Sequence, residues 1–316
     1  MNIKRIRVFE TDATDPHRNL AVEETLLSVV KDDELILYLW QNDHTIVIGK
    51  NQNPWLECKV ADFLNDGGKI ARRITGGGAV YHDGGNLNFS FIAAKENYDQ
   101  AKQFAVICRA VQSFGIEAEV SGRNDVTTEG RKFSGNAFYD NGTAALHHGT
   151  ILICGSAEKM KLYLTPDPAK LQKRSVASVA SRVVNLGELA PEMTIDQMRK
   201  ALILAAEEEY QVPVVRAETN ALPADTFHEK WSRQASPEWI FGEDRKDSEA
   251  YRAILPEGLV SAQVAFDADV AVDAYVFTDA LDVTFAEKMQ KMLLGKSRSE
   301  LEKMGFCPFA RTQGIF

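Results

Sequence analysis

A glycine-rich segment preceded by two arginines is the densest chemical signal in this chain. The segment from Arg72 to Asp83 reads Arg-Arg-Ile-Thr-Gly-Gly-Gly-Ala-Val-Tyr-His-Asp. Successive glycines let a backbone approach a ligand closely, and the N–H groups of such a loop can surround an anion. The arginines add fixed charge and fork-shaped donors for phosphate or carboxylate. We therefore expect an anion-binding loop at a strand end. The alternative is a glycine-rich hairpin with solvated arginines. A P-loop is excluded, because no Gly-Lys-Ser/Thr follows at the required distance.

A lysine among small residues is the second candidate for chemistry. Lys132 lies in the segment Gly130-Arg-Lys-Phe-Ser-Gly-Asn-Ala137, shortly after Ser121-Gly-Arg-Asn-Asp125. The segment becomes apolar beyond Lys132, so its ammonium group is expected to project into a pocket. A compact cation is useful where a carboxylate meets an α-phosphate, because two anions must come together before they react. The alternative is a surface lysine near a turn.

Two adjacent histidines form the third candidate. His147 and His148 precede Gly149 and Thr150 in an apolar segment. Neighbouring side chains on a strand point to opposite faces, so both histidines cannot reach one metal without a bulge. No third ligand stands at a suitable spacing, which argues against zinc. We expect one histidine to pack or hydrogen-bond at a pocket wall, where Thr150 offers a hydroxyl group.

Length, charge and cysteine usage narrow the class of protein. A chain of 316 residues suits one large domain and a small one. The net charge of -9 argues against a nucleic-acid binder. Four cysteines without a CxxC pair suggest neither a zinc site nor a disulfide framework. We see no signal peptide and no run of membrane-spanning length, so we expect a cytoplasmic protein without a membrane partner.

The hydrophobic pattern predicts the elements that must position these residues. We expect strands near 3–9, 35–40, 45–48, 70–73, 86–93, 118–120, 132–139 and 144–153. We expect helices near 16–30, where Asp15-Pro16 marks the start, and near 57–64, 98–114, 158–164, 194–210 and 227–236. These make up an expected catalytic domain over residues 1–242. A charged segment over 243–252 reads as a linker. Residues 253–316 then predict a small α+β domain, with strands near 259–266 and 270–278 and helices near 285–294 and 298–303.

The segment from Arg72 to Asp83, continued through Gly85-Asn-Leu-Asn-Phe-Ser-Phe91, closely resembles the lipoate-binding loop and strand of the bacterial lipoate–protein ligase A family. The likeness covers nearly the whole chain. It also includes Asn19–Glu24, Leu39–Asn42, Ile48–Trp55, Gly122–Asp125, Arg131–Ala137, His147–Thr150, Asp167–Pro168, Ser178–Leu186 and Trp239–Gly242.

This resemblance implies a fold and an activity. The fold would be α+β, with a mixed β-sheet flanked by helices as in class II aminoacyl-tRNA synthetases and biotin ligases, and with a small C-terminal accessory domain. The activity would be ATP-dependent ligation. Lipoate would be activated to lipoyl-AMP with release of pyrophosphate, and the lipoyl group would pass to a lysine of a lipoyl-domain acceptor protein. Such acceptors are the acyltransferase subunits of 2-oxoacid dehydrogenases and the H protein of glycine cleavage.

The resemblance also implies roles for individual residues. Lys132 would be the catalytic lysine, and Asp125 would hold Mg²⁺ or orient the nucleotide. ATP and lipoyl-AMP would be bound by Arg73, Gly76, Gly77, Gly78, Ala79, Val80, Tyr81, Asp125 and Lys132. The lipoate pocket would be lined by Trp40, His82, Ser134, Gly135, His147, Gly149 and Thr150. Glu24 is a weaker match.

Three other functions remain open at this point. An acyltransferase of the same fold would move octanoyl or lipoyl groups between carriers without ATP, through a cysteine thioester. Cys154 is the candidate, but its apolar neighbours offer nothing to activate a thiol. A non-catalytic lipoate-binding or carrier-binding regulator is the second alternative. A biotin ligase, the third, is disfavoured because the Gly-Arg-Gly-Arg type of loop is absent. The preference between lipoate and octanoate stays open, and we expect a monomer.

Overall fold

A large mixed β-sheet forms the centre of the molecule. The computed structural model describes residues 3–122, 124–165, 183–242 and 247–309. The sheet has eight strands in the order β11-β1-β2-β6-β10-β9-β8-β7. Strand β1 is parallel to β2 and β11, whereas the pairs β2–β6, β6–β10, β10–β9, β9–β8 and β8–β7 are antiparallel. The strands are β1 (Arg5–Glu10), β2 (Glu34–Trp40), β6 (Asn86–Ala94), β7 (Glu119–Ser121), β8 (Asp125–Thr128), β9 (Arg131–Asp140), β10 (Ala144–Leu152) and β11 (Val214–Ala217).

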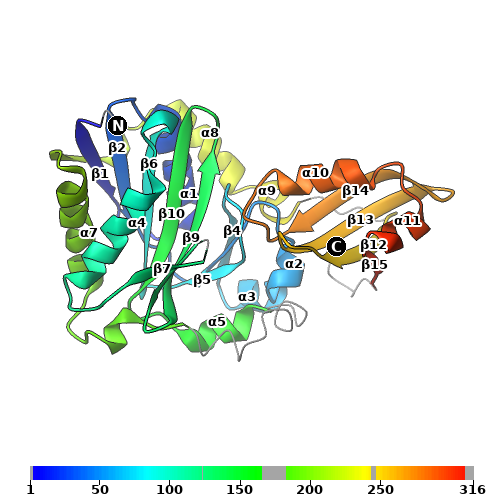
Figure 1. Ribbon diagram of the computed structural model, residues 1–316, viewed down its shortest axis with the longest axis horizontal. Coiled ribbons are helices and arrows are strands. Elements are labelled where there is room, and N and C mark those ends of the chain that lie inside the picture. Colours follow the sequence, from blue (N-terminus) through cyan, green and yellow to red (C-terminus); the bar gives the residue numbers. More distant parts are fainter. Residues whose placement is uncertain (1–2, 123, 166–182, 243–246, 310–316) are drawn as a thin grey trace.

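Helices cover both faces of this sheet (Figure 1). Helices α4 (Gln100–Gln112) and α7 (Ile195–Tyr210) pack on the face that carries Phe91. Helices α1 (Pro16–Val29) and α8 (Ala224–Gln234) belong to the other face, which carries Ile92. Because side chains alternate along a strand, the central strands can be apolar on both faces. Asp15 caps α1 and Pro16 occupies its first turn, as the sequence predicts.

A second, three-stranded sheet carries the glycine-rich segment. Its order is β4-β3-β5, with β3 (Thr45–Ile48), β4 (Lys69–Arg72) and β5 (Val80–His82). Around it lie α2 (Pro54–Glu57), α3 (Val60–Asn65), α5 (Ala157–Tyr163) and α9 (Pro237–Phe241). The single helix expected over 57–64 is wrong. Cys58 is extended, with φ −151° and ψ 162°, and forms a β-bridge with Leu164. This pairing ends α2 before α3 begins.

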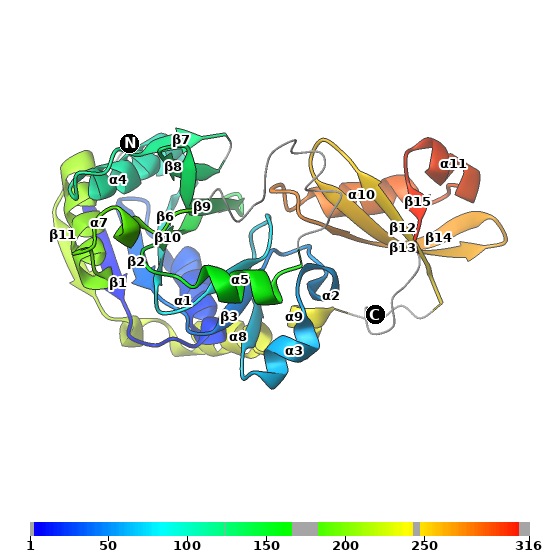
Figure 2. The same cartoon turned by 90° about the horizontal axis from the view of Figure 1, so that it is seen from below.

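A separate four-stranded sheet forms the C-terminal unit, in the order β14-β13-β12-β15. Its elements are β12 (Glu249–Ile254), β13 (Leu259–Asp267), β14 (Val270–Thr278), α10 (Phe285–Leu293), α11 (Arg298–Lys303) and β15 (Cys307–Pro308). This unit extends to one side of the large sheet (Figures 1 and 2). Strand β12 begins inside the expected linker, and residues 243–246 lie outside the described part. The α+β class with a mixed sheet flanked by helices is confirmed.

Short 3-10 helices complete the described chain: η1 (Lys95–Asn97), η3 (Leu186–Glu188) and η4 (Thr219–Ala221). In the described ranges, no helix combines the length and the apolar character needed to cross a membrane.

Candidate functional site

The buried side chain of Arg73 holds the glycine-rich loop in place through hydrogen bonds. Its guanidinium donates to the Thr75 hydroxyl at 3.0 Å and to the carbonyl oxygens of Gly76 and Gly78 at 2.7 and 2.8 Å. It also donates to the Val47 carbonyl at 3.2 Å. Carbonyl oxygens would repel a phosphate, so turning them toward a cation favours anion binding on the other side of the loop. Burial lowers the pKa of Arg73 to about 10, which leaves it charged at neutral pH.

Arg72 points the other way and has a structural role. Its guanidinium donates to the backbone carbonyls of Gly49, Lys50 and Gln52, and to those of Trp239 and Ile240. It thereby ties the segment after β3 to helix α9. The sequence places two arginines side by side, but strand alternation separates them: one supports the neighbouring segments and the other the glycine-rich loop.

Lys132 lies in a small polar cluster near the start of β9. Its Nζ lies 2.7 Å from Oδ1 of Asp125 on β8. A Cβ atom placed on Gly135 would lie 2.9 Å from this Nζ and 3.9 Å from Oγ1 of Thr150. Lys132, Asp125, Gly135 and Thr150, all expected site residues, therefore come together. The side chain of Lys132 is 37% exposed, so its ammonium can meet a ligand.

Lys132 and the glycine-rich loop lie on the same face of the large sheet. Thr150 beside Lys132 shares a face of β10 with His148, two residues away. His148 in turn contacts the loop, with its Nε2 2.8 Å from Oγ1 of Thr75. One strand thus connects the lysine to the loop. This juxtaposition of a cation and a candidate anion loop is what acid activation requires.

His147 faces the opposite side of the sheet. Its ring nitrogens contact Gln103 at 3.1 Å and Asn136 at 2.9 Å, and its ring packs against Phe104 and Phe138. The structure therefore does not bring His147 together with Thr150. His148 takes that place instead. Side chains alternate along a strand, so the sequence predicts that the two histidines face opposite sides of the sheet. It does not show which of them faces Thr150.

Two more predicted pocket residues lie beside Asn136 and not beside Lys132. Ser134 accepts a hydrogen bond from Nδ2 of Asn136 at 3.2 Å. A Cβ on Gly149 would lie 2.6 Å from Oδ1 of Asn136 and 2.6 Å from Phe89, so this glycine permits close packing. Both residues support the strands that carry the cluster around Lys132, and neither is seen to line a cavity with it.

Trp40 and His82 are buried near the loop. Trp40 donates from Nε1 to Oγ of Ser90 at 3.0 Å. Nδ1 of His82 lies 3.2 Å from Nδ2 of Asn42. Burial, and then the charges of Arg73 and His148, lower the pKa of His82 to about 3. His82 therefore stays uncharged at neutral pH and is suited to neutral hydrogen bonding.

The C-terminal unit contacts the glycine-rich loop. Gly77 donates its backbone N–H to the Ala280 carbonyl at 3.2 Å, and Asn51 accepts from the Thr278 N–H at 2.7 Å. A Cβ on Gly76 would lie 2.3 Å from the Ala280 oxygen and 2.5 Å from that of Leu281, so only glycine fits there. Ala79, Val80 and Tyr81 continue from the loop into β5.

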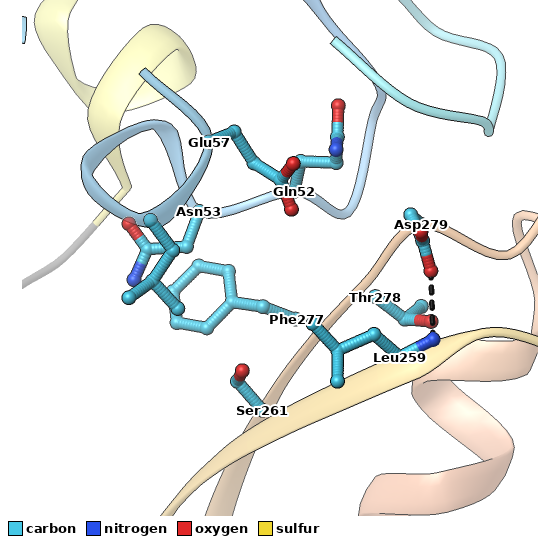
Figure 3. A pocket seen from close by; sticks show the side chains of 9 residues that line it. Gln52, Asn53, Glu57, Leu259, Ser261, Phe277, Thr278 and Asp279 are labelled. Carbon is cyan, nitrogen blue, oxygen red and sulfur yellow. Dashed lines mark hydrogen bonds between the residues drawn. The ribbon is translucent and has the colours of Figure 1, made fainter. Parts of the chain in front are cut away.

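A small pocket opens beside this contact (Figure 3). Gln52 and Asn53 line it from the large unit, while Phe277 and Thr278 line it from β14. Asp279 closes one side and accepts from the Leu259 N–H at 2.8 Å. None of the residues expected to bind ATP or lipoate lines this pocket, which lies between the C-terminal sheet and α2.

The site residues expected from the sequence did not include Glu23, Thr75 and Ser90, and of the two candidate histidines they included His147 and not His148. Glu24 resembled the family pattern, but it pairs with Arg233 and Gln234 of α8, and burial raises its pKa. The neighbouring Glu23 is the one that contacts His148. Its spacing of four residues from the buried Asn19 was an available signal, since such residues share a helix face.

Metal ligands are sparse in the described structure. No group of three or more His, Cys, Asp or Glu side chains that could hold a metal occurs in its four ranges. Asp125 is the carboxylate nearest to Lys132, and its pairing with that lysine leaves a second carboxylate oxygen. Mg²⁺ often binds through one or two carboxylates together with substrate phosphates. Asp125 therefore fits a metal that arrives with a nucleotide.

Gly135 offers a test of the position of the ammonium group. In Gly135→Ala the new methyl group would displace Nζ of Lys132, because the two would lie 2.9 Å apart. We expect kcat for the reaction at this site to fall about tenfold, as expected when a charged group is misplaced by a fraction of an ångström. Steady-state kinetics would measure this change. Gly84→Ala is the matched control, because its methyl group would meet nothing within 4 Å. Equal kcat values in both variants would contradict the placement.

Comparisons with known proteins identify the family to which this chain is similar. The family model described as "Lipoyl protein ligase A/B catalytic domain" matches residues 15–207. The Lipoate-protein ligase A of Bdellovibrio bacteriovorus is 35% identical over 305 residues, covering 93% of this chain and 89% of that protein. The crystal structure of P. falciparum LipL1 with lipoate has a TM-score of 0.81 and 29% identity, covering 95% of this chain and 93% of that one. A bipartite lipoate protein ligase of Thermoplasma acidophilum, solved with its E2 lipoyl domain, has a TM-score of 0.66 and 25% identity, covering 78% and 99%.

Proposed function

This chain belongs to the lipoate–protein ligase family, and from that premise we propose that its Lys132 cluster and glycine-rich loop together catalyse the activation of lipoate by ATP. The chain is an ATP-dependent lipoate–protein ligase. The observation that carries the assignment of residues is the position of Lys132 and the loop on one sheet face, connected through Thr150 and His148.

The first half-reaction joins two anions. A lipoate carboxylate oxygen attacks the α-phosphorus of ATP, the bond to the β-phosphate oxygen breaks, and pyrophosphate leaves. The Lys132 ammonium would lie between carboxylate and phosphate and lower their repulsion as charge builds on the phosphoryl oxygens. The loop from Gly76 to Tyr81 would hold the phosphate through backbone N–H groups other than that of Gly77, which donates to the Ala280 carbonyl. Arg73 would keep the carbonyls of Gly76 and Gly78 turned away.

The second half-reaction transfers the acyl group. The deprotonated amine of an acceptor lysine attacks the acyl carbonyl of lipoyl-AMP, an amide forms, and AMP leaves with the electron pair of the anhydride oxygen. Lys132 would polarise the carbonyl oxygen and neutralise the departing phosphate. The acceptors we propose are lipoyl domains of 2-oxoacid dehydrogenase acyltransferase subunits and the H protein of glycine cleavage. The lipoyl domain solved with the Thermoplasma acidophilum relative supports this choice.

We assign Mg²⁺ to Asp125 as part of the same proposal. The metal would arrive with ATP, bound mainly by phosphate oxygens, and would supply further charge neutralisation. We also propose a cytoplasmic monomer. A reducing compartment suits a chain whose four cysteines are all unpaired. Residues 1–242 would bind both substrates and residues 253–316 would cover the nucleotide loop.

Pyrophosphate release tests the proposal directly. Purified protein would be incubated with ATP, Mg²⁺ and either lipoate or octanoate, with and without each acceptor protein. We expect acid-dependent release of pyrophosphate, and AMP release with acylated acceptor only when acceptor is added. Acyl transfer from an octanoyl or lipoyl carrier with ATP omitted would instead support the transferase that uses Cys154. Tight carrier binding without pyrophosphate release would support a regulator.

A further inference from the structure

Glu23 is a buried carboxylate that the reaction above does not use. It lies in the middle of α1 and exposes none of its surface. Its Oε1 accepts from the Ser90 hydroxyl at 2.5 Å and from Nδ1 of His148 at 2.8 Å. Its Oε2 has no hydrogen-bond partner among the described residues. A buried carboxylate is unfavourable unless it is paired or hydrogen-bonded. The partners of Glu23 therefore indicate what it does in the site.

One branch of hydrogen bonds runs from Glu23 to the glycine-rich loop. A carboxylate only accepts, so Nδ1 of His148 donates to Glu23. Nε2 of His148 is then free to accept the Thr75 hydroxyl proton at 2.8 Å. The Thr75 oxygen accepts in turn from Nε of Arg73 at 3.0 Å. Every bond therefore points from the guanidinium toward the carboxylate, and the chain of donors and acceptors is consistent from end to end.

A second branch runs from the same oxygen to Trp40. Ser90 donates to Glu23 and accepts from Nε1 of Trp40 at 3.0 Å. All three side chains are buried. Trp40 belongs to the proposed lipoate pocket, whereas Thr75 and Arg73 belong to the proposed nucleotide loop. A single carboxylate oxygen thus connects one residue of each substrate subsite.

We propose that Glu23 is a positioning residue that makes binding of the acid and binding of the nucleotide interdependent, through its bonds to Ser90–Trp40 and to His148–Thr75. This inference rests on the proposed function. Displacing one branch leaves a buried donor or acceptor unsatisfied, which is unfavourable, so the two branches hold each other in place. A ligand that fixes Trp40 therefore favours the ordered loop, and the effect is reciprocal.

Cross-effects between the subsites test this coupling. Substituting Glu23 itself would leave two buried partners unsatisfied and could unfold the chain, so the outer members are changed. Thr75→Val, in the loop, should raise the KM for lipoate as well as that for ATP. Trp40→Phe, in the acid pocket, should raise the KM for ATP. We expect each cross-effect to be about fivefold, the lower end of usual coupling factors.

Thr25→Val is the matched control for the loop variant. Thr25 is equally buried and its hydroxyl donates to the Ala21 carbonyl within α1, outside both branches. It should leave both KM values unchanged. If Thr75→Val altered only the KM for ATP and Trp40→Phe only that for lipoate, the coupling would be overturned.

A readout without substrates separates this inference from the proposed function. The chain has four tryptophans, so ¹⁵N-labelled protein gives four indole N–H signals, and the one missing in Trp40→Phe identifies Trp40. Thr75→Val should shift this signal and speed its hydrogen exchange, while Thr25→Val leaves it unchanged. If the Trp40 signal does not move in Thr75→Val, the coupling through Glu23 is overturned, even if the chain is an active ligase. If the wild type releases no pyrophosphate, the proposed function is overturned instead. The Trp40 signal then still shows whether Glu23 couples the two branches.

Discussion

Replacing Lys132 by methionine should reduce lipoate-dependent pyrophosphate release by roughly 100- to 1000-fold, the usual cost of removing one donor that stabilises transition-state charge. Methionine keeps most of the side-chain volume and removes the ammonium group. The loss should fall on kcat, because the cation matters most while charge moves onto the phosphoryl oxygens. A coupled assay for pyrophosphate under saturating ATP and lipoate would measure it.

Lys95→Met is the matched control for this variant. Lys95 also pairs with an aspartate, Asp140, at 2.9 Å, and both side chains of that pair are about half exposed. Its loss should leave kcat unchanged. Lys132→Arg separates charge from shape. The Nζ atom lies so near Gly135 that a Cβ built there would be 2.9 Å from it, which leaves little room for the larger guanidinium, so we expect little rescue. Near wild-type activity in Lys132→Met would remove the mechanism.

Replacing Arg73 by methionine should reduce kcat/KM for ATP by about 100-fold, which corresponds to about 2.7 kcal/mol of lost stabilisation. The carbonyls of Gly76 and Gly78 would lose the donors that now hold them at 2.7 and 2.8 Å. The loop would then be free to turn carbonyl oxygens toward the phosphate. We expect the KM for ATP to rise at least about tenfold, because the loop must be ordered at the moment of binding.

Arg199→Met distinguishes a loop effect from general destabilisation. Arg199 is similarly buried and donates to Gln41 from helix α7. Thermal melting of both variants would show the cost of losing a buried guanidinium, and only Arg73→Met should change the KM for ATP. An unchanged KM in a folded Arg73→Met protein would mean that the loop does not bind the nucleotide.

The C-terminal unit contacts the same glycine-rich loop that Arg73 holds in place. The Ala280 carbonyl accepts the N–H of Gly77, so the loop that would bind phosphate is also a docking surface for the chain after β14. The C-terminal domain was predicted from the sequence as a fold unit, but the contact was not. The contact joins residues about 200 positions apart. Hydrophobic periodicity describes only neighbouring residues, so it cannot predict such a contact.

The sequence alone determined the types of residue available and the elements that carry them. Hydrophobic spacing predicted the strands around Lys132 and His148 and the helix capped by Asp15. Three glycines after two arginines predicted a loop for an anion, and the order of motifs along the chain identified the family. These signals are local, because they depend on neighbours within one helical turn or one strand.

Only the tertiary structure decided which side chains face one another. Strand alternation says that His147 and His148 point apart, but the packing of α1 and α4 on opposite faces decides that His148 meets the loop. In the same way, burial against the sheet selects Glu23 rather than Glu24. The physical reason is that a short segment fixes the direction of each side chain relative to its own backbone, whereas its partner is fixed by where the rest of the chain packs.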